Sequence, residues 1–175
     1  MFKELGLPNF TANAFLYMGD SHYRSGDPAA GLNTPPPREV WEAMFEQARL
    51  AQEIRSIVDA PVFVLSAYRS PEYNAALPNA GRRSQHLFGR ATDIRSTAGE
   101  PALFAAAMRL RRLGKFSGGI GRYDWGIHFD HRGRDANWDF RSPKKKRARK
   151  KTAKKAARKK IARKKIAKKK KGGER

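Results

Sequence analysis

Residues 84–93 read Ser-Gln-His-Leu-Phe-Gly-Arg-Ala-Thr-Asp, and this stretch carries the most specific structural signal in the sequence. His86 follows a loop that is rich in Gly, Asn and Arg. Gly89 permits a sharp turn of the backbone. The alternating pattern of residues 91–95 then predicts a strand that carries Asp93. A chain that turns and returns in this way can bring His86 and Asp93 side by side.

A second polar pair lies in residues 127–130, Ile-His-Phe-Asp. On a strand, His128 and Asp130 share one face, while their apolar neighbours take the opposite one. His86, Asp93 and His128 then offer three nitrogen and oxygen ligands, the number that catalytic zinc sites use beside an open position. By spacing alone, the same residues could equally be polar side chains on the surface or packed in the interior.

The rest of the body predicts long helices and short strands. Periodic apolar residues indicate an amphipathic helix over residues 38–58, and a Pro and a Gly frame a second helix over 100–113. A short helix is expected from Ser70-Pro71 to about residue 77. Residues 62–65 predict a buried strand, and further extended runs are expected at 91–95, 119–123 and 125–130. Because no βαβ repeat occurs, we predict an α+β fold with a small, mostly antiparallel sheet and flanking helices.

The positive charge of the chain is concentrated at its C-terminal end. Of 175 residues, 38 are Lys or Arg and 16 are Asp or Glu; residues 143–175 hold 20 of the former and a single acid, Glu174. We therefore expect one domain over residues 1–142 and a polycationic tail over 143–175. The tail has too little apolar surface to fold when free, so we predict that it is disordered. Such a block attracts polyanions, and nucleic acid and anionic cell-wall polymers both fit as partners.

Composition also excludes several classes. Without cysteine, a disulfide framework and a thiolate metal site are excluded. No run approaches the roughly 18 apolar residues of a membrane span, so we expect no membrane span. The first ten residues lack the basic-then-apolar layout of a signal peptide. Cytoplasmic synthesis is therefore expected, with the final localisation left open and release to the cell wall as one route.

The two polar segments resemble the zinc D-Ala-D-Ala carboxypeptidase superfamily, whose members cut peptidoglycan peptides. Its signature, Ser-x-His-x-x-Gly-x-Ala-x-Asp and a later His on a strand, is filled in this chain by Ser84, His86, Gly89, Ala91, Asp93 and His128. The phrases at residues 66–74, 118–123 and 130–133 are also similar to the family. The resemblance covers about residues 8–138 and is closest to the compact phage and bacterial branch. It does not cover the tail, which is similar in composition to Lys/Ala-rich histone-like tails.

The resemblance implies roles for individual residues. His86, Asp93 and His128 would bind Zn²⁺, which would activate a water and polarise the scissile carbonyl. Arg69 would hold a substrate carboxylate or the developing oxyanion, and the alternative is that it only forms a structural ion pair. Ser84 would either contact the substrate near the metal or merely cap its loop. The implied activity is that of a D,D-carboxypeptidase or endopeptidase on peptidoglycan peptides, and we expect a monomer.

The chain departs from the family pattern at the general base. Better-known members place a carboxylate three residues before the last His ligand, and that position is Trp125 here. We predict Asp124 as the base if its segment bulges toward the zinc. Asp130 is the alternative base, or it orients His128 from behind. His131 is expected to be an exposed polar residue.

The missing carboxylate keeps a second function open. In that alternative, the zinc fold is a catalytically weak or inactive module, and the basic tail binds nucleic acid. A weaker third interpretation makes the domain a part of a virion or another assembly. A family resemblance does not by itself establish turnover.

Overall fold

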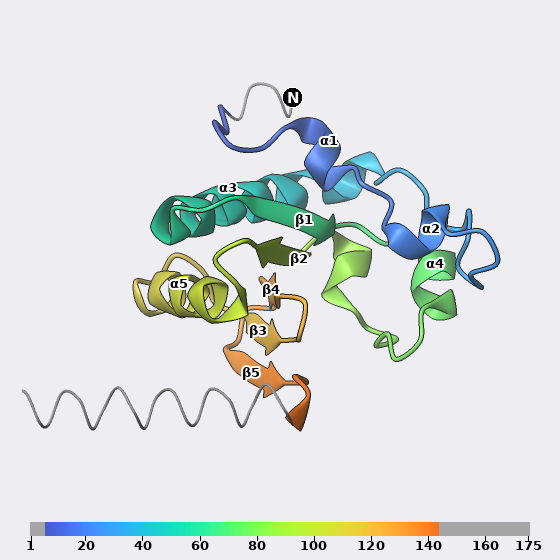
Figure 1. Ribbon diagram of the computed structural model, residues 1–175. Coiled ribbons are helices and arrows are strands. Elements are labelled where there is room, and N and C mark those ends of the chain that lie inside the picture. Colours follow the sequence, from blue (N-terminus) through green and yellow to red (C-terminus); the bar gives the residue numbers. More distant parts are fainter. Residues whose placement is uncertain (1–5, 144–175) are drawn as a thin grey trace, which may run out of the picture. The chain divides into compact units, whose positions relative to one another are not determined.

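Figure 1 shows a computed structural model of the chain, which describes residues 6–143. By its internal contacts the chain divides into two units after Phe140, and every strand of the described residues belongs to the first unit. The basic tail lies outside the described residues except at its first position, so its boundary after Ser142 and its disorder stay predictions.

Five short strands form one sheet in the order β1-β2-β4-β3-β5. They are β1 (Val62–Ser66), β2 (Ala91–Ser96), β3 (Gly119–Arg122), β4 (Ile127–Asp130) and β5 (Ala136–Asp139). The pairs β1–β2, β2–β4 and β3–β4 are antiparallel, and β3–β5 is parallel. The predicted α+β fold with a mostly antiparallel sheet is confirmed. The parallel strand β5 was not anticipated, because its pattern of alternation is short and half polar.

Two long helices pack on each other and on the sheet (Figure 1). Helix α3 (Trp41–Val58) continues a 3-10 turn, η2 (Arg38–Val40), and α5 (Glu100–Arg112) begins with a proline in its first turn. Both predicted long helices are confirmed, although the first turn of the helix predicted over residues 38–58 is a 3-10 turn. The core lies between these helices and one face of the sheet, and it includes Met44, Ala48, Ile54, Leu103, Ala107, Ile94, Ile120, Ile127 and Phe129.

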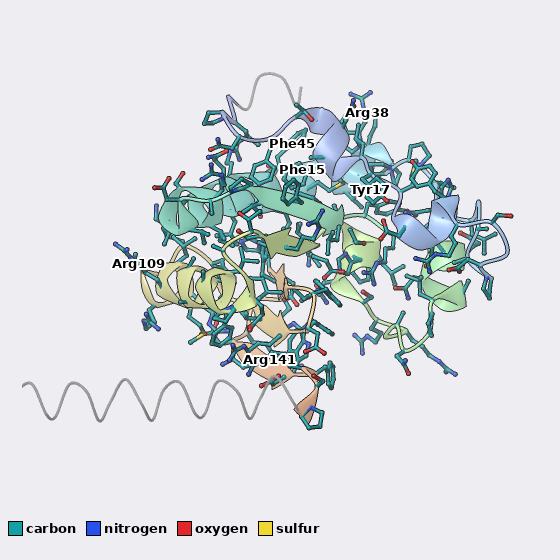
Figure 2. The ribbon with its side chains drawn as sticks, in the orientation of Figure 1. Phe15, Tyr17, Arg38, Phe45, Arg109 and Arg141 are labelled. Carbon is teal, nitrogen blue, oxygen red and sulfur yellow. The ribbon has the colours of Figure 1, made fainter. Side chains whose placement is uncertain are left out.

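Short elements complete the described part of the chain. Helices α1 (Ala12–Phe15) and α2 (Asp20–Tyr23) precede α3, while α4 (Pro71–Ala76) and the 3-10 turn η3 (Gln85–Phe88) lie between β1 and β2. Ser70 caps α4 as predicted, since its Oγ accepts a hydrogen bond from the backbone N–H of Tyr73 at 3.3 Å. Phe15 of α1, labelled in Figure 2, is buried in the core and anchors this end of the chain.

Strand β1 differs from the prediction of a buried strand. It is the edge of the sheet, and the side chain of Phe63 is 41% exposed. The Arg95 guanidinium lies over the Phe63 ring, 4.4 Å from its centroid, and covers part of this apolar surface. A continuous apolar run does not by itself distinguish a central strand from an edge strand that long neighbouring side chains shield. Among residues 6–143, no helix has the length and apolar character needed to cross a membrane.

Candidate metal centre

The register of β2 and β4 brings two of the predicted ligands together. Asp93 on β2 pairs directly with His128 on β4. Their neighbours Ile94 and Ile127 are fully buried in the core. Since side chains alternate between the two faces of a strand, Asp93 and His128 lie on the face away from the long helices.

His86 reaches the same place from the 3-10 turn η3. The Oγ of Ser84 caps this turn by accepting a long hydrogen bond, 3.4 Å, from the His86 backbone N–H. Gly89 ends the turn with a left-handed φ of 63°. A Cβ at Gly89 would lie 2.8 Å from Met44 Cγ and 2.9 Å from Val40 O, so helix α3 leaves no room for a side chain. Glycine is thus required here both for conformation and for space.

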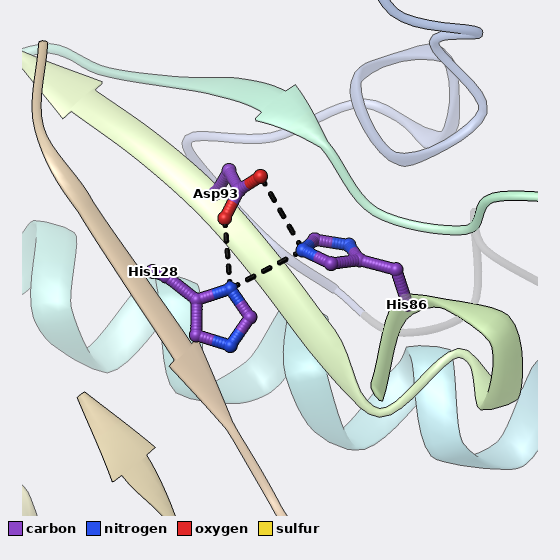
Figure 3. Close-up of side chains that lie close together, drawn as sticks. All are labelled: His86, Asp93 and His128. Carbon is purple, nitrogen blue, oxygen red and sulfur yellow. Dashed lines mark hydrogen bonds and ion pairs between the residues drawn. The ribbon is translucent and has the colours of Figure 1, made fainter. Parts of the chain in front are cut away.

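The three side chains converge, as Figure 3 shows. One ligand atom of each lies within 4.8 Å of the others. His86 Nε2 is 3.2 Å from His128 Nδ1 and 3.3 Å from Asp93 Oδ2, while His128 Nδ1 is 2.9 Å from Asp93 Oδ1. All three residues are buried.

The outer nitrogens of both imidazoles are engaged by acceptors. His86 Nδ1 donates to the backbone oxygen of Ala67 at 2.6 Å, and His128 Nε2 donates to Asp130 Oδ2 at 2.9 Å. Because these partners only accept, the outer nitrogens carry protons and the inner nitrogens present lone pairs. Two lone pairs and a carboxylate then face one another, an arrangement that a cation stabilises. Outer acceptors of this kind are typical of histidines that bind zinc.

The electrostatics of His86 and Asp93 suit metal ligands. Burial lowers the pKa of His86 to about 4, and the positive charge of Arg69 acts in the same direction. His86 is therefore neutral at pH 7, which is the state that binds a metal. Burial disfavours the charged form of Asp93, but its interactions with His86, Arg69 and His128 outweigh burial and hold the pKa of Asp93 well below its usual range.

His128 behaves differently. Burial works against its charged form, yet hydrogen bonds to Asp130 and Asp93 raise its pKa. A metal ion and a proton compete for the inner nitrogen of His128, so metal binding there would weaken as the pH falls.

Asp130 holds the outer nitrogen of His128 through a hydrogen bond. Its carboxylate is fully buried, and it also accepts hydrogen bonds from Gly119 N at 2.9 Å and from Arg132 Nη2 at 2.6 Å. Burial opposes ionisation, but the bonds from His128 and Arg132 outweigh it and lower the Asp130 pKa. Asp130 lies on the face of His128, where the strand pattern puts it, and holds the ring in one orientation.

The structure places the other predicted residues at different distances from the cluster. Arg69 adjoins it, with Nη2 2.5 Å from Asp93 Oδ2 and Nε 2.9 Å from Ser66 Oγ. Ser84 lines the same cavity as the three ligands, whereas Asp124 is exposed and is not among the residues that line it. His131 is half-buried instead of exposed, because its Nδ1 accepts a 2.5 Å hydrogen bond from the buried Gln47.

The cavity above the cluster has a volume of about 1100 Å³. Among its described lining residues, Asp93 is the one carboxylate; arginine and aromatic side chains dominate the wall, including Arg83, Arg132, Arg134, Tyr123, Trp125, Trp138 and Phe140. Sequence reasoning missed Trp138, which comes from the unanticipated strand β5. The available signal was the pair Gly119 and Gly121, two glycines on one face of a strand, which leave room for a ring: a Cβ at Gly121 would lie 2.2 Å from Trp138 Nε1.

A comparison with known protein families matches the part of the chain that contains the candidate centre. A family model described as Peptidase M15 matches residues 19–130, a span that contains every ligand of the candidate centre. No curated protein sequence matches the chain.

Proposed function

Because the chain belongs to the peptidase M15 family, we propose that it is a zinc-dependent peptidase that hydrolyses D-amino-acid-containing peptides of peptidoglycan. The bond cut would be a terminal D,D-bond, as in a carboxypeptidase, or an internal one, as in an endopeptidase. The observation that carries the proposal is the cluster of His86, Asp93 and His128, with its inner lone pairs and its outer acceptors.

His86, Asp93 and His128 would hold the Zn²⁺, because the donor set and the tautomers fit that ion. Bound zinc supplies a Lewis acid and a water of lowered pKa. Asp130 and the Ala67 carbonyl keep both imidazoles oriented for this role. Arg69 holds Asp93 in its charged form and lies where its guanidinium can stabilise negative charge on a substrate.

Asp124 remains our proposal for the proton acceptor. It lies between Tyr123 and Trp125, two residues that line the cavity, so a small shift of this segment would carry its carboxylate toward the substrate. The variant Asp124→Asn is expected to lower kcat at least 100-fold and to leave the zinc content unchanged. Asp59→Asn is the matched control, because the Asp59 side chain is 99% exposed and lies at the far end of α3.

We also propose that residues 143–175 bind an anionic polymer, either of the cell wall or a nucleic acid. The support is the charge, 20 basic residues against one acid. Binding would raise the local concentration of substrate around the site. A truncation to residues 1–142 is expected to lose polyanion binding together with its steep salt dependence.

The function is tested by adding one equivalent of zinc to the purified protein and incubating it with cross-linked peptides and with peptides ending in D-Ala-D-Ala. Product masses are then compared with those of His86→Ala. Zinc-dependent cleavage that His86→Ala lacks supports the peptidase and identifies the bond. One bound zinc per chain without any cleavage would instead favour the alternative, a zinc-fold module with a nucleic-acid-binding tail. That alternative is favoured because Asp93 is the one carboxylate among the described residues that line the cavity.

A further inference from the structure

Tyr123, in the wall of the cavity, forms a hydrogen bond in which the structure fixes which group donates and which accepts. Trp138 Nε1 lies 2.9 Å from Tyr123 Oη. An indole N–H can only donate, so the Tyr123 oxygen is the acceptor in this bond. The phenolic proton of Tyr123 must therefore point elsewhere. Within residues 6–143, the Trp138 indole is the only hydrogen-bond partner of this hydroxyl.

The Tyr123 ring is held in place on several sides. It stacks on Trp125, with ring centroids 4.7 Å apart and planes inclined by 13°. Its centroid also lies 5.7 Å from that of the Phe140 ring. Trp138, in turn, lies against the bare backbone of Gly121, where a Cβ would collide with its ring. The hydroxyl is thus positioned before any ligand arrives, which is the condition under which a hydrogen bond contributes most to catalysis.

Tyr123 lines the same cavity as the three candidate ligands. The Trp138 ring, which donates to Tyr123, lies 5.3 Å from the His128 ring. The Trp138 indole therefore contacts both the Tyr123 hydroxyl and a ligand of the candidate centre. Burial raises the pKa of Tyr123, so the hydroxyl keeps its proton at neutral pH.

Arg69, which lines the same cavity, already uses most of its donor nitrogens in bonds within the protein. Two of the three guanidinium nitrogens of Arg69 already donate, to Asp93 and to Ser66. Tyr123, by contrast, presents its one proton to the cavity.

We propose that Tyr123 is a catalytic residue that donates a hydrogen bond to the oxygen of the scissile carbonyl. The inference rests on the proposed peptidase function. When water adds to the carbonyl carbon, the C=O π pair moves to this oxygen, and the Tyr123 O–H stabilises the resulting negative charge. When the pair returns, the C–N bond breaks and the amine leaves with a proton derived from the water. Tyr123 keeps its own proton throughout, and Trp138 is the positioning residue.

The first test is kinetic. Tyr123→Phe removes only the hydroxyl, so kcat on the best-cleaved peptide is expected to fall about 100-fold while KM changes little. Trp138→Phe keeps a ring but loses the N–H, and a smaller fall in kcat is expected. Tyr23→Phe is the control, because Tyr23 is 63% exposed and does not line the cavity. Zinc content and circular dichroism confirm that each variant is loaded and folded.

The second test needs no turnover. A phosphinate analogue of the same peptide carries a tetrahedral, negatively charged centre in place of the scissile amide. Titration calorimetry should show that Tyr123→Phe binds this analogue about 100-fold more weakly than the unaltered protein. Affinity for the cleaved product peptide should be unchanged, because that ligand lacks the tetrahedral centre.

The outcomes separate the two proposals. If peptides are cleaved and Tyr123→Phe matches the unaltered protein in kcat and phosphinate affinity, the role of Tyr123 is overturned and the peptidase function stands. If the zinc-loaded protein neither cleaves the peptides nor binds the phosphinate, the proposed function is overturned and this inference with it.

Discussion

The outer nitrogen of His128 lies 2.9 Å from Oδ2 of Asp130, two residues along the same strand. This bond fixes which nitrogen of the imidazole faces the candidate metal site. It also links the ligand to the Gly119 backbone and to Arg132, since both donate to the same carboxylate. The orientation of one ligand is thus set by two segments of the chain, residues 128–132 and the start of β3.

Replacing Asp130 with Asn should weaken zinc binding without removing a ligand. The amide keeps the shape of the carboxylate but not its charge, so the inner nitrogen of His128 donates its lone pair to the metal less strongly. Zinc affinity, measured by competition with a chelator, is expected to fall by about 10- to 100-fold. The control Asp59→Asn should not change it, and an unchanged affinity in Asp130→Asn would show that the His128 ring needs no such support.

Gly121→Ala should destabilise the fold and disturb the cavity wall. The added methyl would lie 2.2 Å from Trp138 Nε1, so the indole must move and its bond to Tyr123 is lost. We expect a loss of about 1–3 kcal/mol in the free energy of unfolding, measured with urea. Gly81→Ala is the matched control, because its new methyl would meet no atom within 4 Å. Equal stability of the two variants would contradict the close approach of β5.

Glu100→Ala should lower the free energy of unfolding far more than a comparable change on the surface. Glu100, in the first turn of α5, forms two bonds with the buried Arg122 on β3, at 2.5 and 2.9 Å. Removing the carboxylate leaves a buried positive charge, and such losses typically cost about 3–5 kcal/mol. The exposed pair Glu53–Lys115 provides the comparison, and Glu53→Ala should cost about 0–1 kcal/mol. Similar values for both variants in urea unfolding would rule out a special role for the buried pair.

His131 should make the protein less stable as the pH falls. Burial lowers its pKa, and its Nδ1 accepts a hydrogen bond from Gln47, which requires the neutral ring. The unfolded chain, with a His pKa of about 6.5, then binds more protons than the folded one. The contribution of His131 to the free energy of unfolding is therefore complete above pH 6.5 and declines below it. In His131→Asn, unfolding followed by fluorescence between pH 7.5 and 5.5 should show a shallower decline; an identical slope would show that His131 does not contribute.

The sequence was most informative where the determinants are local. Residues 84–93 contain a capping serine, a left-handed glycine and the start of a strand, so the approach of His86 to Asp93 follows from neighbouring residues alone. The alternation in residues 127–130 likewise predicts that His128 and Asp130 share a face.

Other parts of the site depend on contacts between distant segments. Trp138 reaches the cavity only because β5 pairs in parallel with β3, so that Gly121 lies beside it. Nothing within residues 136–139 specifies that partner. The pairing of Arg69 with Asp93 and the placement of Asp124 outside the cavity lining are also results of packing. Spacing in the sequence identifies a side chain as a candidate but does not show what it touches.

The positions of the three ligands have a further consequence for the folding of the chain. His86 and His128 are 42 residues apart, and Asp93 and His128 are 35 apart. An ion bound to all three would close the long loop between Asp93 and His128, and the short one between His86 and Asp93, in the unfolded chain. It would thereby reduce the conformational entropy of that chain, as a covalent cross-link does. In a chain without cysteine, the ion could thus take over the part that a disulfide plays in other small proteins. Loss of the metal would then lower resistance to heat and proteases as well as activity.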